Sequence, residues 1–360
     1  DWVYKALVLL VIACPCALVI STPVTIVSGL AAAARHGILI KGGTYLEKGH
    51  KLTWLALDKT GTITYGQPIQ TDFELLGDLA VADCLRLAAS LAGRSDHPVS
   101  QAVVNASKTQ GIIHASVNDF EALLGRGVRG VINGKAYCLG NHRLVHELNR
   151  CSIALEARLD ELERQGKTVI MLFDDSQVLA LFAVADTVKD SSRAAIKDLH
   201  RLGIKTIMLT GDNPHTAEAI AQQVGIDQGR GNQLPEDKLR VVETLSTEGT
   251  IGMVGDGIND APALARAHIG FAMGAMGTDT AIETADVALM DDDLRKIPTF
   301  IRLSQATRSV LIQNITLALG IKIVFLILTL MGFGTMWMAV FADVGASLLV
   351  VGNGLRLLRK

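Results

Sequence analysis

Long apolar segments near both ends of the chain constrain its fold more than any other feature. A membrane-spanning helix needs about 20 mainly apolar residues, and three segments reach that length, at about 2–34, 311–332 and 336–352. We therefore predict three spanning helices, the last two joined by a tight turn into a hairpin. A secretory signal peptide explains the first segment less well, because the segment is too long and Pro15 and Pro23 break its centre.

The charge pattern indicates on which side of the membrane the intervening region lies. Basic residues follow the first and third apolar segments, at Arg35, Lys41, Lys48, Arg356, Arg359 and Lys360. By the positive-inside tendency these flanks are cytoplasmic. We expect an integral protein of the plasma (inner) membrane, in contact with lipid, with its soluble domains in the cytoplasm. The net charge of −2 gives no basic footprint, so no nucleic-acid partner is expected.

The cysteines indicate the redox compartment, and the first residue leads us to expect that the chain belongs to a longer polypeptide. The five cysteines show no spacing typical of a disulfide framework, at Cys14, Cys16, Cys84, Cys138 and Cys151. The soluble part is therefore expected in a reducing compartment. The chain starts at Asp1 and enters an apolar run at once, so we interpret it as a piece of a longer polypeptide.

The middle of the chain alternates strands and helices. Segments 52–62, 204–212 and 250–260 each combine an apolar, β-rich run with a polar loop at its carboxyl end. This pattern predicts a parallel sheet with ligands at the strand ends. The expected domains are a transmembrane helix (1–36), an α/β domain in two parts (37–65 and 186–305), an inserted α+β domain (66–185) and a transmembrane helical hairpin (306–360).

Cys14, Pro15 and Cys16 lie together inside the first apolar segment. A disulfide between cysteines one residue apart is disfavoured by its geometry. Core packing and a soft-metal site both remain open, because free cysteine packs as a small hydrophobe and thiolates bind soft ions. Residues i and i+2 of a regular helix point about 200° apart, but Pro15 lacks an N–H and distorts the helix. Local unwinding could then turn both sulfurs to one side.

Asp58 ends the first predicted strand of the α/β domain, in "LDKTGTIT". A carboxylate at such a position can attack a phosphoryl group and form an aspartyl phosphate. Two residues later stands Thr60, where aspartate-dependent phosphatases commonly carry a second carboxylate as general acid and base. Without that carboxylate the phospho-aspartate should persist. A long-lived phosphoenzyme suits an energy-transducing machine better than a simple phosphatase.

The other strand ends supply groups for the same chemistry. Thr210 in "TGD" offers a hydroxyl to a phosphate oxygen, and Lys238 in "PEDK" offers a positive charge to the transferring phosphoryl group. Asp256 and Asp260 in "GDGIND" offer hard oxygen ligands suited to Mg²⁺. A turn rich in Asp and Gly would explain any one motif alone, but not all of them in this order after predicted strands.

The motifs "DKTGT", "TGD" and "GDGIND" resemble the phosphorylation domain of P-type ATPases, which has a haloacid-dehalogenase-like fold with a Rossmann-like parallel sheet. The resemblance covers essentially the whole chain. It implies that ATP transiently phosphorylates Asp58, and that Asp58, Thr60 and Asp256 bind Mg²⁺. The catalytic positions that it implies are Asp58, Lys59, Thr60, Thr210, Gly211, Asp212, Lys238, Asp256, Asn259 and Asp260.

The inserted domain resembles the nucleotide-binding domain of the heavy-metal branch of this family. "SDHPVS" matches its His-Pro motif, and a glycine pair and an asparagine match further positions. The nucleotide-binding residues that this implies are His97, Pro98, Gly125, Gly127 and Asn141. Alone, His97 would more often be an ordinary surface or core histidine. The family usually has a glutamate five residues before the histidine, where this chain has Ala92, so adenine recognition is expected to be weakened or rearranged.

The transported ion is indicated by the apolar segments. In the heavy-metal branch, Cys-Pro-Cys binds the ion within the membrane, which assigns Cys14 and Cys16 as ligands. Lys322 and Asp343 lie within the hairpin, where charged residues are functional by default. The hairpin resembles the zinc/cadmium/lead-exporting subfamily, with Asp343 as a further ligand and Lys322 as a built-in counter-ion. A lysine that reaches the membrane surface is the alternative for Lys322.

These observations predict ATP-driven export of Zn²⁺, Cd²⁺ or Pb²⁺. The alternatives are a Cu⁺ or Ag⁺ exporter, a membrane-anchored phosphatase of the same fold, and a metal sensor built on a decayed pump. The Asn-rich and Met/Ser patterns of copper pumps do not occur in the hairpin. The Thr-Gly-Glu loop of the family's actuator domain does not occur either, so this domain and further helices are expected in a missing N-terminal part.

Overall fold

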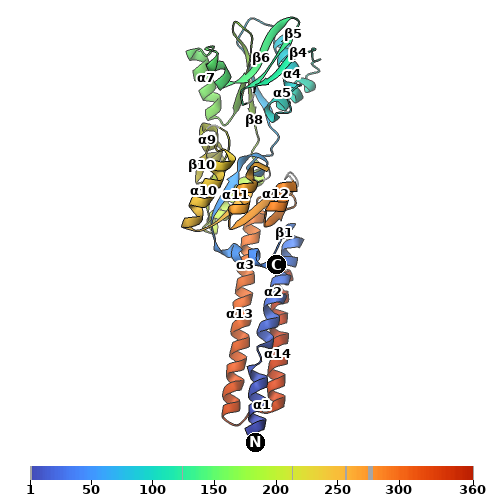
Figure 1. Ribbon diagram of the computed structural model, residues 1–360, viewed down its shortest axis with the longest axis vertical. Coiled ribbons are helices and arrows are strands. Elements are labelled where there is room, and N and C mark those ends of the chain that lie inside the picture. Colours follow the sequence, from blue (N-terminus) through green and yellow to red (C-terminus); the bar gives the residue numbers. More distant parts are fainter. Residues whose placement is uncertain (1, 124, 213, 256–257, 275–278, 360) are drawn as a thin grey trace. The chain divides into compact units, whose positions relative to one another are not determined.

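The structure is a computed structural model that describes residues 2–123, 125–212, 214–255, 258–274 and 279–359. The chain folds as two compact units (Figure 1). The first unit comprises Asp1–Leu55, Lys197–Lys205 and Leu239–Lys360. The second unit comprises Ala56–Ile196 and Thr206–Lys238.

Long apolar helices form one part of the first unit. They are α1 (Trp2–Ala13), α2 (Cys16–Arg35), α13 (Lys296–Leu330) and α14 (Met336–Leu355). Within this unit, α2, α13 and α14 lie side by side (Figure 1). Three segments are long and apolar enough to cross a membrane, namely Ala6–Arg35, Lys296–Leu330 and Met336–Arg359. The three predicted spans are therefore present as helices.

Helix α13 is longer than the predicted span, because it begins at Lys296 rather than near residue 311. Pro298 stands in its first turn, where proline is tolerated because the first N–H groups have no partner within the helix. No further proline interrupts the helix before Leu330. The expected domain boundary at 305/306 consequently falls inside a continuous helix.

Asn314 connects three of these helices by hydrogen bonds. Its Nδ2 donates to Thr25 Oγ1 on α2 and to the Val350 carbonyl oxygen on α14, each at 3.2 Å. Asn353 Nδ2 donates to Asn314 Oδ1 at 2.8 Å. Asn314 is fully buried, so leaving its amide without these partners would destabilise the folded protein. These hydrogen bonds fix how α2, α13 and α14 are positioned along one another.

A small sheet belongs to the first unit. Its strands β11 (Thr250–Gly255), β12 (Ile269–Met273) and β13 (Val287–Leu289) run parallel, and β1 (Ile38–Ile40) pairs antiparallel with β13. The parallel arrangement agrees with the sequence prediction, and every residue of β12 is buried. The remaining elements wholly within this unit are α3 (Gly43–Lys48), η1 (Gly49–Lys51), η3 (Ile258–Asp260), α11 (Ala261–Arg266), α12 (Asp279–Thr284) and η4 (Arg356–Arg359).

Four elements contribute residues to both units. They are β2 (Leu52–Asp58), α8 (Asp190–Arg201), β9 (Lys205–Leu209) and α10 (Pro235–Glu248). Within the second unit, β9 pairs in parallel with β10 (Gln228–Arg230). Strands β2, β9 and β11 occupy the three apolar runs identified in the sequence.

A six-stranded antiparallel sheet forms the other part of the second unit. Its order is β3-β8-β7-β6-β5-β4. The strands are β3 (Ile69–Leu75), β4 (Asn118–Leu123), β5 (Gly127–Ile132), β6 (Lys135–Asn141), β7 (Thr168–Phe173) and β8 (Val178–Ala185). The helices and turn of this unit are η2 (Lys59–Ile63), α4 (Val81–Ala92), α5 (Pro98–Thr109), α6 (His142–Glu147), α7 (Ile153–Arg164) and α9 (Pro214–Val224). All six strands lie within the expected insert, 66–185.

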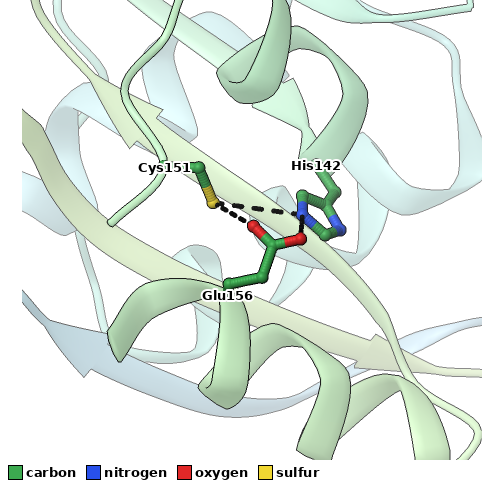
Figure 2. A group of neighbouring side chains, drawn as sticks. All are labelled: His142, Cys151 and Glu156. Carbon is green, nitrogen blue, oxygen red and sulfur yellow. Dashed lines mark hydrogen bonds and ion pairs between the residues drawn. The ribbon is translucent and has the colours of Figure 1, made fainter. Parts of the chain in front are cut away.

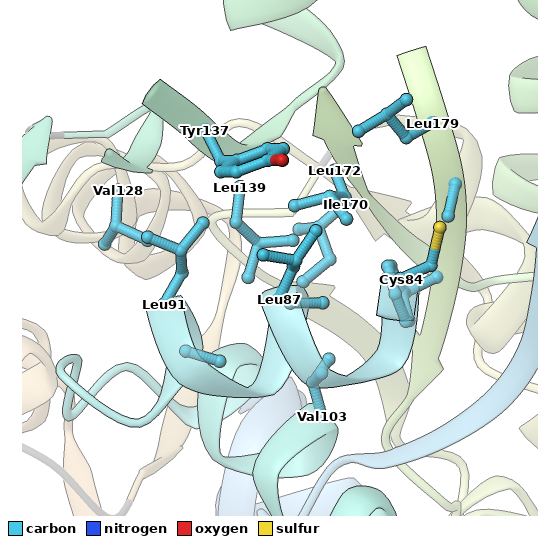
Figure 3. Close-up of a cluster of buried hydrophobic side chains, with 14 of the residues drawn as sticks. Cys84, Leu87, Leu91, Val103, Val128, Tyr137, Leu139, Ile170, Leu172 and Leu179 are labelled. Atoms are coloured by element: carbon cyan, nitrogen blue, oxygen red, sulfur yellow. The ribbon is translucent and has the colours of Figure 1, made fainter. Parts of the chain in front are cut away.

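Strand β7 shows why this sheet can be apolar on both faces. Side chains alternate between the two faces of a strand. Ile170 and Leu172 join a core with α4 and α5 (Figure 3), whereas Met171 and Phe173 join a second core that includes Leu159 of α7. The unbroken apolar run of β7 therefore serves two cores, one on each face of the sheet.

Candidate functional site

Asp58 is the last residue of β2, and its side chain is almost fully buried. Lys238, in the first turns of α10, donates from Nζ to Asp58 Oδ1, and its side chain is also buried. The buried ammonium group offsets the charge of the carboxylate. Strand β2 and helix α10, which are distant in sequence, thus bring two of the predicted catalytic residues into contact.

A second ion pair connects the "DKTGT" and "TGD" loops. Lys59 Nζ lies 2.6 Å from Asp212 Oδ2. Thr210 follows β9 and accepts a hydrogen bond at Oγ1 from the backbone N–H of Asp212 at 3.2 Å, while Gly211 between them is exposed. Four of the predicted catalytic residues are therefore held together at the carboxyl ends of β2 and β9.

The loop after Asp58 turns sharply at Gly61. Thr60 has an extended backbone conformation and is exposed, whereas Gly61 has φ +71°, a left-handed conformation that favours glycine. The Thr64 N–H closes the turn on the Lys59 carbonyl oxygen at 3.1 Å. Thr60 is therefore accessible to a ligand, while Asp58 beside it is buried.

Asp186 and Lys189 support this loop and were not found from the sequence. Asp186 accepts hydrogen bonds from Thr64 Oγ1 and from the Gly66 N–H, and Lys189 Nζ donates to the Gly61 carbonyl oxygen. Burial raises the pKa of the Asp186 carboxyl, although Thr64 favours the ionised form. Both residues follow β8, about 120 positions after the loop, and no local motif marks them.

The "GDGIND" residues belong to the first unit, after β11. Asp256 lies outside the described residues, so its predicted role as a Mg²⁺ ligand has no structural description. Asp260 is buried at the end of η3 against Gly255, where an added Cβ would lie 2.7 Å from Asp260 Oδ2. Glycine is therefore required at 255 for Asp260 to pack there. Asn259 is exposed.

Four of the five predicted nucleotide-binding residues, all except Pro98, line one cavity of about 320 Å³ in the second unit. His97 lies at the N-terminus of α5, where its Nδ1 accepts from the Val99 N–H at 3.3 Å, and Pro98 is the first residue of that helix. Asn141 caps α6 by accepting from the Leu144 N–H, and its Nδ2 donates to the Gly125 carbonyl oxygen at 3.0 Å. The cavity residues are Ser95, His97, Val99, Ser100, Ala122, Leu123, Gly125, Arg126, Gly127, Val128, Leu139, Asn141, Thr168 and Ile170.

The walls of this cavity include residues that the sequence motifs did not identify. Thr168 and Ile170 of β7 line it, although no motif singled them out. Ala92 ends α4, is fully buried in the apolar core and does not line the cavity in the described part of the chain. The position at which the family usually has glutamate thus contributes to packing here.

Cys14 and Pro15 separate α1 from α2, as expected from the missing N–H of Pro15. The Cα atoms of Cys14 and Cys16 lie 5.6 Å apart, and the structure joins the two cysteines by a disulfide. The expectation that their spacing disfavours a disulfide is therefore wrong, because at the break the two side chains need not point about 200° apart as they would in a regular helix. The interpretation that unwinding turns both sulfurs to one side agrees with this contact.

Lys322 connects the broken helix to Asp343. Its Nζ lies 3.5 Å from Asp343 Oδ1 and donates to the carbonyl oxygens of Ile12, at 2.9 Å, and of Cys14. Asp343 Oδ1 accepts no hydrogen bond from the described residues, although it is buried. Lys322 and Asp343 therefore lie in contact, and the counter-ion role given to Lys322 stays a prediction. Lys322 points into the helix bundle rather than toward a membrane surface.

Comparison with known proteins agrees with this arrangement. Residues 52–268 match the haloacid dehalogenase-like hydrolase family. A probable cadmium-transporting ATPase of Staphylococcus aureus (strain MRSA252) is 47% identical over 365 residues, which cover 99% of this chain and 50% of that protein. The zinc/cadmium/lead-transporting P-type ATPase of Escherichia coli (strain K12) is 44% identical over 363 residues, which cover 100% of this chain and 48% of that protein.

One solved structure resembles this chain in both fold and sequence. The crystal structure of a zinc-transporting PIB-type ATPase in the E2.Pi state has a TM-score of 0.85 and 44% sequence identity, and the match covers 99% of this chain and 58% of that chain. The chain spans about half the length of the curated relatives it matches. The chain belongs to the haloacid dehalogenase-like hydrolases, and over 99–100% of its length it is similar to P-type ATPases named for cadmium, zinc or lead transport.

Proposed function

We propose that the full-length protein exports Zn²⁺, Cd²⁺ or Pb²⁺ across the plasma (inner) membrane, driven by ATP through an aspartyl phosphate at Asp58. The contact between Lys322, Asp343 and the broken helix at Cys14 carries this proposal, because it gathers a charge pair beside two sulfur ligands. The names of the relatives and of the solved structure, which specify zinc, cadmium or lead transport, support it. The soluble domains would lie in the cytoplasm, where ATP is available.

The phosphoryl-transfer step uses the residues around Asp58. An Asp58 carboxylate oxygen attacks the γ-phosphorus of ATP, the bond from that phosphorus to the bridging oxygen breaks, and ADP leaves. Lys238 neutralises charge on the transferred group, and the Thr210 hydroxyl donates to one of its oxygens. The Lys59–Asp212 pair holds the two loops in place.

Mg²⁺ fits the donor set of this loop, because Asp58 and Thr60 offer the hard oxygen atoms that this ion prefers. Asp58 and Thr60 would hold it, together with Asp256, which lies outside the described residues. When bound, Mg²⁺ neutralises negative charge on the transferring phosphoryl group. The exposed Thr60 leaves its side of the loop accessible.

The cavity at His97, Gly125, Gly127 and Asn141 would hold the nucleotide. Its apolar walls suit an adenine ring, and His97 and Asn141 offer polar atoms at its edge. Ala92 does not contribute a carboxylate there, so His97 and the backbone of the glycine loop would orient the base.

The transported ion would be bound by the reduced thiolates of Cys14 and Cys16 together with Asp343. Thiolates select soft or borderline ions, and the added hard carboxylate favours a divalent ion over Cu⁺ or Ag⁺. The disulfide must therefore be reduced before the ion binds, in agreement with a cytoplasmic setting. Lys322 would replace the departing ion as the partner of Asp343.

The alternatives have less support. A phosphatase of the same fold would need a general acid or base where Thr60 stands. A metal sensor would not need the buried pair of Asp58 and Lys238. Dephosphorylation would require the actuator domain, which we expect in the further length that the relatives have beyond this chain.

The decisive experiment measures the ATPase rate of the reduced full-length protein in detergent with Zn²⁺, Cd²⁺, Pb²⁺, Cu⁺, Ag⁺ and Co²⁺. Asp58→Asn should abolish both turnover and phosphoenzyme formation, whereas Asp78→Asn, at an exposed carboxylate of the second unit, should leave both unchanged. Stimulation by Zn²⁺, Cd²⁺ and Pb²⁺ supports the proposal. Stimulation by Cu⁺ and Ag⁺ alone would overturn the ion assignment and leave the phosphoenzyme mechanism standing.

A further inference from the structure

Three side chains with different metal-binding atoms converge on one face of the second unit. His142 begins α6, Cys151 lies in the loop before α7, and Glu156 lies in the first turn of α7 (Figure 2). One nitrogen, one sulfur and one oxygen from these residues all lie within 4.8 Å of one another. We call His142, Cys151 and Glu156 the α6–α7 cluster. It shares no residue with the cavity at Asn141 or with Cys14, Cys16 and Asp343.

The separations within the cluster lie within about 0.5 Å of those around a tetrahedral ion. Ligand atoms bonded to Zn²⁺ at 2.0–2.3 Å lie about 3.3–3.8 Å from one another. His142 Nε2 lies 3.2 Å from Glu156 Oε1 and 4.0 Å from Cys151 Sγ. Cys151 Sγ lies 2.8 Å from Glu156 Oε2 as a hydrogen bond. Shifts of a few tenths of an ångström to about 1 Å would place all three atoms around one ion.

His146 lies beside the cluster and could reach it as a fourth ligand by a change of side-chain rotamer. It follows His142 by one helical turn, so the two rings lie on the same side of α6 with their centroids 5.6 Å apart. His146 Nε2 lies 3.4 Å from Glu156 Oε2. The Glu156 carboxylate is thus approached by Cys151 and by both histidines, so an ion bound to Glu156 would lie within reach of the same side chains.

Glu163 provides the support that a metal-binding histidine usually has. It lies two turns after Glu156 on α7, and its Oε1 is 3.6 Å from His142 Nδ1. A carboxylate beside Nδ1 favours the tautomer in which Nδ1 carries the proton and Nε2 is free to bind an ion. Nε2 is the atom that faces Cys151 and Glu156.

We propose that the α6–α7 cluster is a second metal site, which binds Zn²⁺ or Cd²⁺ with His142, Cys151 and Glu156 as ligands and His146 as the fourth. One thiolate, two imidazoles and one carboxylate suit a borderline divalent ion and disfavour Mg²⁺ and Ca²⁺, which take oxygen ligands. The His142 side chain is 23% exposed and that of Glu156 is 39% exposed. An ion can therefore enter from solution without unfolding the domain.

The position of the site indicates what a bound ion would do. The ion would join α6 to α7, and α6 begins directly after Asn141, which holds the carbonyl oxygen of Gly125 at the cavity. Binding would therefore restrain the segment that fixes one wall of that cavity. The site takes the same class of ion as the proposed transport site, but through different residues.

The test uses residues 1–360, reduced and in detergent. Cys14→Ala and Cys16→Ala are combined in this chain so that the sulfur ligands in the membrane helices are removed. Zn²⁺ is titrated against a chromophoric chelator, and Co²⁺ is used as a spectroscopic probe. We expect one Zn²⁺ per chain and a thiolate-to-Co²⁺ charge-transfer band. Adding Cys151→Ser should remove the band and weaken Zn²⁺ binding at least about 100-fold, and Glu163→Gln should weaken it about 10-fold.

Cys138→Ser is the matched control, because Cys138 is another half-buried cysteine of the same sheet domain and lies outside the cluster. It should leave the Zn²⁺ affinity and the Co²⁺ band unchanged. His146→Ala, at a side chain that is 64% exposed, should fold normally and weaken Zn²⁺ binding. Absence of bound Zn²⁺ in the Cys14/Cys16 variant, or binding that survives Cys151→Ser and His142→Ala together, would overturn the proposal. Neither result depends on whether the full-length protein transports an ion.

Discussion

Lys322 Nζ lies 3.5 Å from Asp343 Oδ1 and at the same time donates hydrogen bonds to the carbonyl oxygens of Ile12 and Cys14. These carbonyls are available because Pro15 interrupts the helix: the Leu18 N–H, which would reach the Cys14 carbonyl oxygen in a regular helix, bonds to the Pro15 carbonyl oxygen instead. A single ammonium group therefore compensates both the broken helix and the buried carboxylate. This geometry leads to the first prediction.

Lys322→Ala should leave Asp343 and the carbonyl oxygens of α1 without their cation. We expect the reduced full-length protein to retain its transported ion about 10-fold more tightly, since coupling energies of this kind are typically 1–3 kcal/mol. Metal-stimulated turnover should fall accordingly. Equilibrium dialysis with Zn²⁺ and the ATPase rate measure the two effects. Arg308→Ala, an exposed cation on the same helix, is the control, and equal behaviour of the two variants would contradict the role given to Lys322.

Gly127→Ala should disrupt the cavity proposed for the nucleotide, whereas Gly125→Ala should be tolerated better. Both glycines have positive φ, at +145° and +68°. A Cβ at 127 would lie 2.5 Å from the Gly140 Cα and would collide with the Leu139 carbonyl oxygen, but a Cβ at 125 would meet open space. We expect a loss of about 2–3 kcal/mol for the first change and about 1 kcal/mol for the second.

Thermal unfolding and titration with a fluorescent ATP analogue would compare the two glycine variants. Nucleotide affinity should fall sharply for Gly127→Ala. If Gly125→Ala proved the more damaging change, steric crowding at 127 would not be the controlling factor.

Asp174 should make the stability of the six-stranded sheet depend on pH. Burial opposes its ionised form, but hydrogen bonds from Lys135, from Ser176 and from the Gln177 N–H outweigh burial and hold the pKa of this carboxyl well below its usual range. A lowered pKa in the folded state stabilises the protein above the ordinary pKa of aspartate, near 4. That stabilisation is lost as the pH falls through the pKa of the folded state.

Asp174→Asn should therefore lower the stability by about 1–2 kcal/mol at pH 7. The difference from the parent protein should shrink progressively below about pH 4. Hydrogen exchange of the β7 and β8 amides, corrected for intrinsic rates, measures it locally. Asp175→Asn, at the exposed neighbouring carboxylate, should change little at any pH. A difference for Asp174→Asn that did not vary with pH would show that the charge is unimportant.

Asn314→Leu should loosen the contact between α2, α13 and α14. The substitution removes the hydrogen bonds to Thr25 and Val350 and leaves Asn353 without one acceptor. Hydrogen bonds between membrane helices contribute about 0.6–2 kcal/mol, so unfolding in mixed micelles should occur at a lower denaturant fraction. Gln313→Leu, at the exposed neighbouring position, should have a smaller effect. Equal stability of both variants would exclude Asn314 as a connection between the helices.

The sequence predicted what depends on local pattern. The apolar runs that became β2, β9 and β11 and the apolar segments that became the long helices are continuous in the chain, so their composition identifies them. The loops proposed for phosphoryl transfer are short motifs, one around Asp58 and one around Thr210, and the residues of each motif lie within a few positions of one another. The family resemblance also directed attention to His97 and Asn141, which the structure places at one cavity.

Contacts between distant residues could not be predicted in this way. Asp186 and Lys189 lie over 120 positions from the loop that they support, and no local periodicity marks either residue. Asn314 meets its partners only because three helices pack together. The disulfide between Cys14 and Cys16 was missed for a different reason, since the directions of the two side chains depend on how Pro15 interrupts the helix.

The break at Cys14 and Pro15 also creates two helix ends in the middle of an apolar span. The carbonyl end of α1 carries about half a negative elementary charge, and the amide end of α2 carries about half a positive one. In a medium of low dielectric constant, such partial charges interact strongly with nearby ions. The backbone at the end of α1 therefore attracts one cation, and Lys322 already places its ammonium group there.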